Sequence, residues 1–201
     1  MHLIARQHDA IAETVYFIVL ACWLGFGAIL VIGKRGAAPG AQRRDVKSML
    51  GMLLQGAGYA ICFGAFRPQF FPILAMSKTS EMILAMFTIV LALASTWFCY
   101  SAARTLGKQW ALMARVIEAH ELISVGPYAV VRNPIYLAMF GMLVASALAV
   151  SYWQAIFPAT VVYLIGTFIR IRAEQNLLRA TFGAKFDEYA RRVPAFLPRL
   201  M

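Results

Sequence analysis

The stretch that decides the fold is Pro134–Ile169, with the sequence PIYLAMFGMLVASALAVSYWQAIFPATVVYLIGTFI. It holds two apolar runs, Pro134–Val150 and Trp153–Ile169, which are separated only by Ser151 and Tyr152. Each run is near the lower end of the roughly 17–25 residues that a helix needs to cross a bilayer. Because backbone groups in lipid must bond one another, we expect both runs to be α-helices. The two-residue connection then folds them into a tight antiparallel membrane hairpin.

The composition of the whole chain also indicates a membrane protein. Of its 201 residues, 61% are apolar and 14% are charged, and the mean hydropathy is +0.69. Soluble domains average about 45–50% apolar and about 25% charged residues. Three further apolar runs, Thr14–Ile32, Ser48–Phe66 and Met82–Tyr100, have the length of a membrane span. The sequence therefore predicts an all-α polytopic integral membrane protein with about five transmembrane helices, and its length suits a single domain over residues 1–201.

The basic residues predict the orientation in the membrane. The net charge is +10, and sixteen of the nineteen Lys and Arg residues follow the first, third or fifth apolar run. Because basic loops stay on the cytoplasmic side, we expect the N-terminus outside and the C-terminus in the cytoplasm. We expect the first run to be a retained span, because no small-residue cleavage site of a signal peptide follows it. The basic residues flank apolar spans, so the expected partners include membrane lipids and no nucleic acid.

The three cysteines, Cys22, Cys62 and Cys99, each lie alone within an apolar run. No pair has the spacing of metal ligands, and an odd number gives no disulfide framework. We therefore expect buried apolar side chains here and no metal site.

Two glycine pairs lie inside the predicted spans, Gly25 with Gly27 and Gly56 with Gly58. Neither pair follows a strand, as the glycines of a nucleotide-binding loop would. Small residues let membrane helices approach closely, so we expect helix contacts at these positions.

Two polar clusters border the hairpin. The first is His120–Tyr136, with the sequence HELISVGPYAVVRNPIY, and the second is Arg170–Glu174, with the sequence RIRAE. The hairpin brings both clusters to one membrane face, which the charge pattern assigns to the cytoplasm. Charged groups at the edge of a membrane span are rare unless they are paired or functional. We therefore expect a functional site where the clusters meet.

Local signals predict how the chain enters and leaves the hairpin. Asn133 and Pro134 are the residue types preferred at an N-cap and at the first position of a helix. A helix start has free amides that attract anions. Beyond Glu174, apolar residues recur about one helical turn apart, at Leu178, Phe182, Phe186 and Tyr189. They predict a C-terminal amphipathic helix with a break near Gly183, lying either on the cytoplasmic membrane surface or packed on the cytoplasmic loop without contact to lipid.

Several spaced motifs follow one another in the C-terminal half. They are Leu106–Trp110 (LGKQW), His120–Ile123 (HELI), Gly126–Tyr128 (GPY), Arg132–Tyr136 (RNPIY), Arg170–Glu174, Phe182, Gly183, Phe186, Tyr189 and Arg192–Pro194 (RVP). With these motifs in this order, the chain resembles the isoprenylcysteine carboxyl methyltransferase family, within the wider group of membrane methyltransferases that includes phospholipid N-methyltransferases. The resemblance covers residues 101–201, the expected cofactor-binding and catalytic half, whereas the spans of residues 1–80 carry no matching motif.

The resemblance implies methyl transfer from S-adenosyl-L-methionine to a lipophilic or lipidated acceptor at the cytoplasmic face, with S-adenosyl-L-homocysteine as product. Carried over by motif, the cofactor-binding residues are His120, Glu121, Leu122, Ile123, Tyr128, Asn133, Pro134, Ile135, Tyr136 and Glu174. The family's arginine for the acceptor carboxylate corresponds to Arg170, so the expected catalytic residues are Arg170 and Glu174.

The residue types suit this chemistry. Glu174 can accept hydrogen bonds from an ammonium or a ribose, and the amides that start the fourth span can hold a carboxylate. The guanidinium fork of Arg170 can bond both oxygens of an acceptor carboxylate, and its spacing of four residues from Glu174 places both on one helix face. Tyr128 and Tyr136 offer ring faces and hydroxyls. Catalysis would then consist mainly of positioning and desolvating the two reactants.

Each of these residues also has a plain structural interpretation. His120 could be an interfacial histidine, and Tyr128 and Tyr136 could belong to an aromatic belt. Arg170 and Glu174 could be an exposed helical ion pair worth about 0.3–0.5 kcal/mol. It is the ordered set of motifs that favours an enzyme.

Asn133 bears on the identity of the acceptor. The isoprenylcysteine branch of the family commonly has histidine there, whereas asparagine resembles the phospholipid-methylating relatives. We expect the carboxylate of an isoprenylcysteine-like acceptor; the alternatives are a phospholipid amine, a small thiol, or a non-catalytic or NADPH-dependent protein on the same scaffold. The compact chain with short loops indicates a prokaryotic inner membrane.

Overall fold

The structure is a computed structural model that describes residues 9–36, 46–67, 77–107 and 122–198. These residues form the helices α1 (Ala10–Gly36), α2 (Val46–Gly64), α3 (Lys78–Leu106), α4 (Pro127–Val130), α5 (Pro134–Val150), α6 (Trp153–Phe182) and α7 (Ala184–Arg192). Among the described residues the only strand-like pairing is an isolated bridge between Phe66 and Ser151. The prediction of an all-α polytopic membrane protein is confirmed.

Four of these helices, α1, α2, α3 and α6, are long and apolar enough to cross a membrane. The remaining predicted span, the fourth along the chain, is α5, an apolar helix of 17 residues, which is the lower limit for a span. Both α3 and α6 continue beyond the apolar runs and stop at glycines. Gly107 and Gly183 have φ angles of 51° and 52°, a conformation that residues with a side chain rarely adopt. The predicted break near Gly183 is therefore confirmed.

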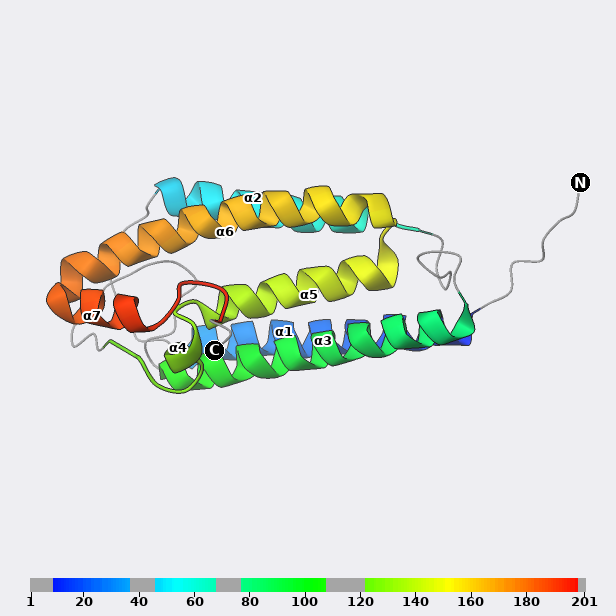
Figure 1. The fold of residues 1–201 in the computed structure, drawn as a ribbon, viewed down its shortest axis with the longest axis horizontal. Coiled ribbons are helices and arrows are strands. Elements are labelled where there is room, and N and C mark those ends of the chain that lie inside the picture. The colour runs from blue at the N-terminus through cyan, green and yellow to red at the C-terminus, as the bar shows by residue number, and fades with distance from the viewer. Residues whose placement is uncertain (1–8, 37–45, 68–76, 108–121, 199–201) are drawn as a thin grey trace, which may run out of the picture.

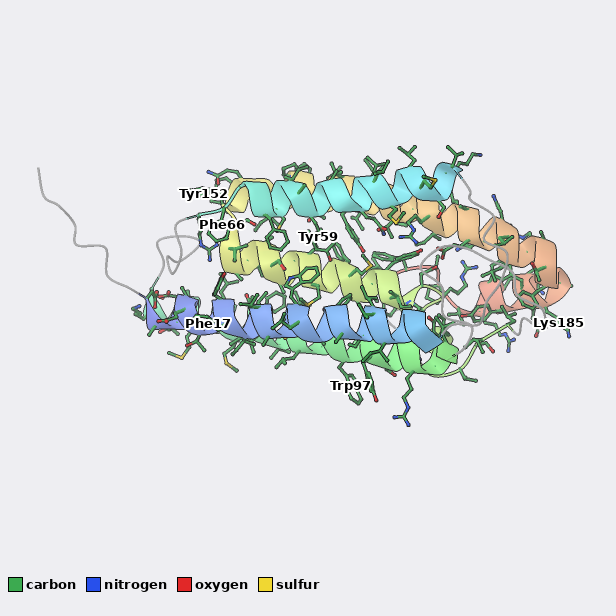
Figure 2. The ribbon with its side chains drawn as sticks, turned by 180° about the vertical axis from the view of Figure 1, so that it is seen from behind. Phe17, Tyr59, Phe66, Trp97, Tyr152 and Lys185 are labelled. Carbon is green, nitrogen blue, oxygen red and sulfur yellow. The ribbon has the colours of Figure 1, made fainter. Side chains whose placement is uncertain are left out.

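The helix α5 lies at the centre of the bundle. Figure 1 shows α2 and α6 along one side of it and α1 and α3 along the other. Small side chains such as Ala138, Ala145 and Ala147 are buried along α5, so its neighbours approach it closely. Large apolar side chains of the surrounding helices are exposed, including Phe157 at 77% exposure and Trp97 at 68% exposure, which faces outward in Figure 2. Such a surface suits lipid and not water.

Glycines allow α2 and α6 to touch along their backbones. A Cβ atom on Gly51 would lie 2.7 Å from the carbonyl oxygen of Gly166, and one on Gly166 would lie 2.5 Å from the carbonyl oxygen of Gly51. A Cβ on Gly58 would lie 2.9 Å from the carbonyl oxygen of Ala159. No larger residue fits at these three positions without separating the helices.

The two predicted glycine pairs have different surroundings. Gly58 lies in the contact between α2 and α6, as expected. A Cβ on Gly25 would meet only the methyl group of Thr96, at 3.6 Å, and one on Gly27 or Gly56 would meet no atom of the described residues within 4 Å. Sequence alone cannot distinguish a glycine in a helix contact from one that faces lipid.

A buried arginine closes the hairpin between α5 and α6. Arg67 is 7% exposed. Its Nη1 donates to the carbonyl of Ser151 at 2.8 Å, and its Nη2 donates to those of Leu148 and Ala149 at 3.0 and 2.7 Å. A helix ends in carbonyls without helical partners and in a partial negative charge, so Arg67 caps α5. Burial lowers the pKa of Arg67 to about 10, which leaves the guanidinium charged at neutral pH.

At the opposite end of the bundle, α7 folds back onto α6. Phe186, Tyr189 and Val193 are buried together, against Leu178 and Phe182 from the end of α6. The apolar face of this amphipathic helix therefore packs on the protein, against the end of α6. The fold thereby gathers α4, α7, the start of α5 and the end of α6 into one end of the bundle (Figure 1).

Candidate active site

A recess opens at the end of the bundle where α4, α5, α6 and α7 meet. Its volume, including its open mouth, is about 530 Å³. Its lining residues are Leu106, Leu122, Ile123, Tyr128, Arg132, Asn133, Glu174, Gln175, Leu178, Phe186 and Tyr189. Residues of both polar clusters therefore share one surface.

Five of the ten predicted cofactor-binding residues line this recess. They are Leu122, Ile123, Tyr128, Asn133 and Glu174. Tyr136 does not line the recess, but its hydroxyl contacts Glu174, which does. Pro134 is buried at the start of α5, and Ile135 packs against the cluster formed by α1, α3 and α5. His120 and Glu121 lie outside the described residues.

Glu174 is the centre of the polar contacts beside the recess. The hydroxyl of Tyr136 donates to its Oε1, and Nη2 of Arg170 lies 3.8 Å from the same oxygen. The Arg170 guanidinium lies 4.8 Å from the centroid of the Tyr136 ring, within the range of a cation–π interaction. The Glu174 side chain is 22% exposed and that of Arg170 is 7% exposed. The carboxylate is thus reachable from the recess, whereas the guanidinium lies deeper.

A residue from the N-terminal half also reaches Arg170. Oε1 of Gln55 in α2 accepts a hydrogen bond from Nη1 of Arg170 at 2.9 Å, and Nε2 of Gln55 donates to Oγ1 of Thr167 at 2.9 Å. Sequence reasoning did not place Gln55 in the site. The available signal was an amide side chain within an apolar run, which needs a partner inside the bundle.

Asn133 occupies the N-cap position of α5, but its side chain does not cap the helix. Its Nδ2 donates to the carbonyl of Ala195 at 2.7 Å, and the backbone N–H of Arg132 donates to the carbonyl of Pro194 at 2.9 Å. The predicted positions of Asn133 at the N-cap and of Pro134 at the helix start are confirmed, but the Asn133 amide bonds a carbonyl distant in sequence and makes no capping hydrogen bond. Asn133 instead ties the stretch after α7 to the start of α5.

Two further donors line the recess. Nε of Arg132 and Nε2 of Gln175 are buried atoms that have no hydrogen-bond partner within the described ranges. Buried donors of this kind normally find an acceptor, often a ligand or a water molecule. The Arg132 guanidinium also lies 5.7 Å from the centroid of the Phe186 ring. Burial lowers the pKa of Arg132, and the nearby charge of Arg179 acts in the same direction.

The phenols around the recess are neutral. Burial raises the pKa of Tyr128 well above its usual range, and the charge of Glu174 raises it further. Burial raises the pKa of Tyr189 to about 12, and its hydroxyl donates to the carbonyl of Tyr128 at 2.6 Å. The recess therefore combines one reachable carboxylate, cationic donors and aromatic walls, which suits a ligand with a cation, an anion and a flat ring.

Residues 82–185 match the family model described as phospholipid methyltransferase. These residues cover just over half of the chain and include α4, α5, α6, Arg170 and Glu174. The chain thus carries the conserved region of a family of membrane proteins. It belongs to the phospholipid methyltransferase family, and the resemblance inferred from the sequence motifs is confirmed.

Two curated relatives are similar over 98 residues, which are 48% of this chain. The nickel-cobalt-cadmium resistance protein NccN of Alcaligenes xylosoxydans xylosoxydans is 39% identical, with 45% of its length covered. The cobalt-zinc-cadmium resistance protein CzcN of Cupriavidus metallidurans is 36% identical, with 44% of its length covered. The aligned part therefore spans less than half of each relative. Within the described residues of this chain, no group of three or more His, Cys, Asp or Glu side chains could hold a metal ion.

Proposed function

We propose that this protein transfers a methyl group from S-adenosyl-L-methionine to a lipophilic acceptor, and that the recess holds the cofactor. The observation that carries the proposal is the carboxylate of Glu174, which borders the recess and whose Oε1 is contacted by both Tyr136 and Arg170. Methyltransferases of this family generally use S-adenosyl-L-methionine.

The lining of the recess fits this cofactor. S-adenosyl-L-methionine carries a sulfonium, an ammonium, a carboxylate, a ribose and an adenine. Glu174 supplies the negative charge for the cationic part, and Arg132 and Gln175 supply buried donors for the carboxylate and the hydroxyls. Tyr128 and Phe186 supply aromatic faces for the adenine. This set of groups would leave few polar atoms of the cofactor without a partner.

The residues around the recess would act mainly by orientation. The bound cofactor would supply an electrophilic methyl carbon to a lone pair of the acceptor, with the carbon–sulfur bond broken and S-adenosyl-L-homocysteine left. Glu174 holds the cationic part of the cofactor at a fixed position, and Tyr136 fixes the carboxylate of Glu174. An ionised carboxylate acceptor has no proton to lose, so positioning and exclusion of water are sufficient.

We propose the carboxylate of an isoprenylcysteine-like molecule as the acceptor and Arg170 as its binding group. Arg170 lies next to Glu174 in α6, and its Nη2 contacts that carboxylate at ion-pair distance instead of hydrogen-bond distance. A phospholipid amine or a small thiol is the second candidate. Asn133 favours it, because asparagine at this position resembles the phospholipid-methylating relatives.

We place this chemistry at the cytoplasmic face of a prokaryotic inner membrane. Arg132, Arg179, Lys185, Arg191 and Arg192 all lie at the recess end of the bundle. Basic residues concentrate on the cytoplasmic side of such membranes, so their position supports this orientation.

A methyl-transfer assay tests the proposed reaction. Detergent-purified protein is incubated with radiolabelled S-adenosyl-L-methionine and, separately, an S-prenylcysteine acid, a phosphatidylethanolamine and an alkyl thiol. We expect label in the prenylcysteine product. Calorimetry on the same sample should show binding of S-adenosyl-L-homocysteine and no binding of NADPH. The absence of S-adenosyl-L-homocysteine binding would refute the proposal.

Arg170→Ala tests the acceptor site, with Arg172→Ala as the matched control. Arg172 is an exposed arginine of the same helix. We expect Arg170→Ala to abolish esterification of the S-prenylcysteine acid while the affinity for S-adenosyl-L-homocysteine stays within a few-fold, and Arg172→Ala to retain activity. Parental turnover by Arg170→Ala would show that another group binds the acceptor.

A further inference from the structure

Gln55 is a buried polar residue in a helix that carries no motif of the family. It is 2% exposed and lies in the middle of α2. An amide is costly to bury in a membrane helix unless it is hydrogen-bonded. Both described partners of its side chain lie in α6, next to the proposed acceptor site.

Two hydrogen bonds fix the orientation of the Gln55 amide. Its Oε1 accepts from Nη1 of Arg170, and its Nε2 donates to Oγ1 of Thr167, both at 2.9 Å. Thr167 and Arg170 are three residues apart, so they share a face of α6. Rotation of the amide would break both bonds, which makes Gln55 a fixed acceptor for the guanidinium.

The backbone contact beneath this bridge brings the amide within reach. Gly51 lies one turn before Gln55, and a Cβ there would lie 2.5 Å from Cγ of Arg170. Gly166 lies one turn before Arg170, and a Cβ there would lie 2.8 Å from the backbone nitrogen of Gln55. Because the two glycines have no side chain, α2 can lie directly against the aliphatic part of the Arg170 side chain.

The Arg170 guanidinium also contacts Glu174 and Tyr136. Its Nη2 lies 3.8 Å from Oε1 of Glu174, and its Cζ lies 4.8 Å from the centroid of the Tyr136 ring. An arginine side chain has many rotamers, and ordering it before the ligand arrives raises affinity. Nη1 of Arg170 is thus hydrogen-bonded to Gln55 of α2, while Nη2 lies beside Glu174.

We infer that Gln55 is a positioning residue of the acceptor site, which holds the Arg170 guanidinium so that Nη2 is presented beside Glu174 to an anionic acceptor. This inference rests on the proposed function. It gives the N-terminal half of the chain a part in substrate binding, through a residue that does not line the cofactor recess.

Gln55→Met tests the inference, because methionine has a similar length and no amide. We expect the KM for an S-prenylcysteine acid to rise about ten- to a hundred-fold, the range expected for losing a hydrogen bond to a charged group. The affinity for S-adenosyl-L-homocysteine should change by less than about two-fold. Tyr59→Phe is the matched control. Tyr59 lies one turn further along α2, and its hydroxyl donates a 2.6 Å hydrogen bond to the carbonyl of Met139 that does not involve Arg170. The substitution removes this bond. Its KM should be that of the parent.

The outcomes separate this inference from the proposed function. A parental KM for Gln55→Met, or an equal loss of S-adenosyl-L-homocysteine affinity, overturns the inference while the methyltransferase stands. A parent that binds no S-adenosyl-L-homocysteine overturns the proposed function and the inference with it. If Gln55→Met does not fold, Gln55→Glu carries the test, because it keeps an acceptor oxygen and adds a negative charge beside Arg170. It should raise the KM for the anionic acceptor about ten-fold or more, and an unchanged KM overturns the inference.

Discussion

Tyr136 makes three separate contacts from one position in α5. Its hydroxyl donates to Glu174, its ring lies beneath Arg170, and its backbone carbonyl accepts from the Tyr163 hydroxyl at 3.0 Å. The first contact concerns the proposed cofactor site, the second the proposed acceptor site and the third the packing of α5 on α6. The contact with Glu174 can be separated from the other two by removing the hydroxyl oxygen.

Tyr136→Phe removes the hydroxyl and keeps the ring. We expect the affinity for S-adenosyl-L-homocysteine to fall about ten-fold or more, because Glu174 loses a hydrogen bond that orients its charge. Calorimetry measures the affinity. Tyr152→Phe, at the opposite end of the bundle and 48% exposed, should bind like the parent. Unchanged affinity in Tyr136→Phe would mean that the cofactor does not use Glu174.

Asn133→Ala tests the link between α5 and the stretch after α7. Loss of the bond to the Ala195 carbonyl should lower the free energy of unfolding by about 0.5–1.5 kcal/mol and speed proteolysis after α7. Asn176→Ala is the control, because Asn176 is an exposed asparagine of α6. Thermal unfolding and limited proteolysis in detergent measure both effects. Equal behaviour of the two variants would show that the Ala195 bond contributes nothing.

The contact between α2 and α6 is the helix contact that depends most on the absence of side chains at its glycines. Gly51→Ala places a Cβ 2.5 Å from Cγ of Arg170 and 2.7 Å from the carbonyl oxygen of Gly166, so the two helices must separate. We expect a lower melting temperature and a loss of methyl transfer of about ten-fold or more, because Arg170 moves with the contact.

Gly56→Ala is the matched control on the same helix. A Cβ at Gly56 meets no atom of the described residues within 4 Å, and alanine favours a helix over glycine by about 1 kcal/mol. This variant should be as stable as the parent or more stable. If both variants unfold at the same temperature, close packing of α2 on α6 is not needed for stability.

The elements themselves were largely predictable from the sequence, because apolar length and glycine stops are local signals. The break at Gly183 and the turn at Ser151 and Tyr152 follow from them. Contacts between distant residues were not predictable in the same way. Asn133 matches the N-cap preference, yet its amide bonds Ala195. Gln55 was visible as a polar residue in a span, but only the packing of α2 on α6 shows that Arg170 is its partner.

At the scale of the whole molecule, the orientation in the membrane can be measured with a pair of cysteines. Tyr152 and Lys185 lie at opposite ends of the bundle (Figure 2). In intact bacterial cells, a membrane-impermeant maleimide should label Tyr152→Cys and should label Lys185→Cys only after permeabilisation. The native Cys22, Cys62 and Cys99 are buried and can be replaced by alanine as a further control. The reverse labelling pattern would place the recess outside.

The burial of α5 among the other helices bears on where in the bilayer a reaction would take place. Its 17 residues give a length of about 25 Å, which is less than the hydrocarbon thickness of about 30 Å. A lipid-facing helix would have to tilt or thin the bilayer to relieve this mismatch, but α5 is shielded from lipid. A helix of this length that crosses the bilayer cannot reach the headgroups with both of its ends. Under the proposed function, an acceptor would then be selected partly by the distance between its reactive atom and its hydrocarbon tail.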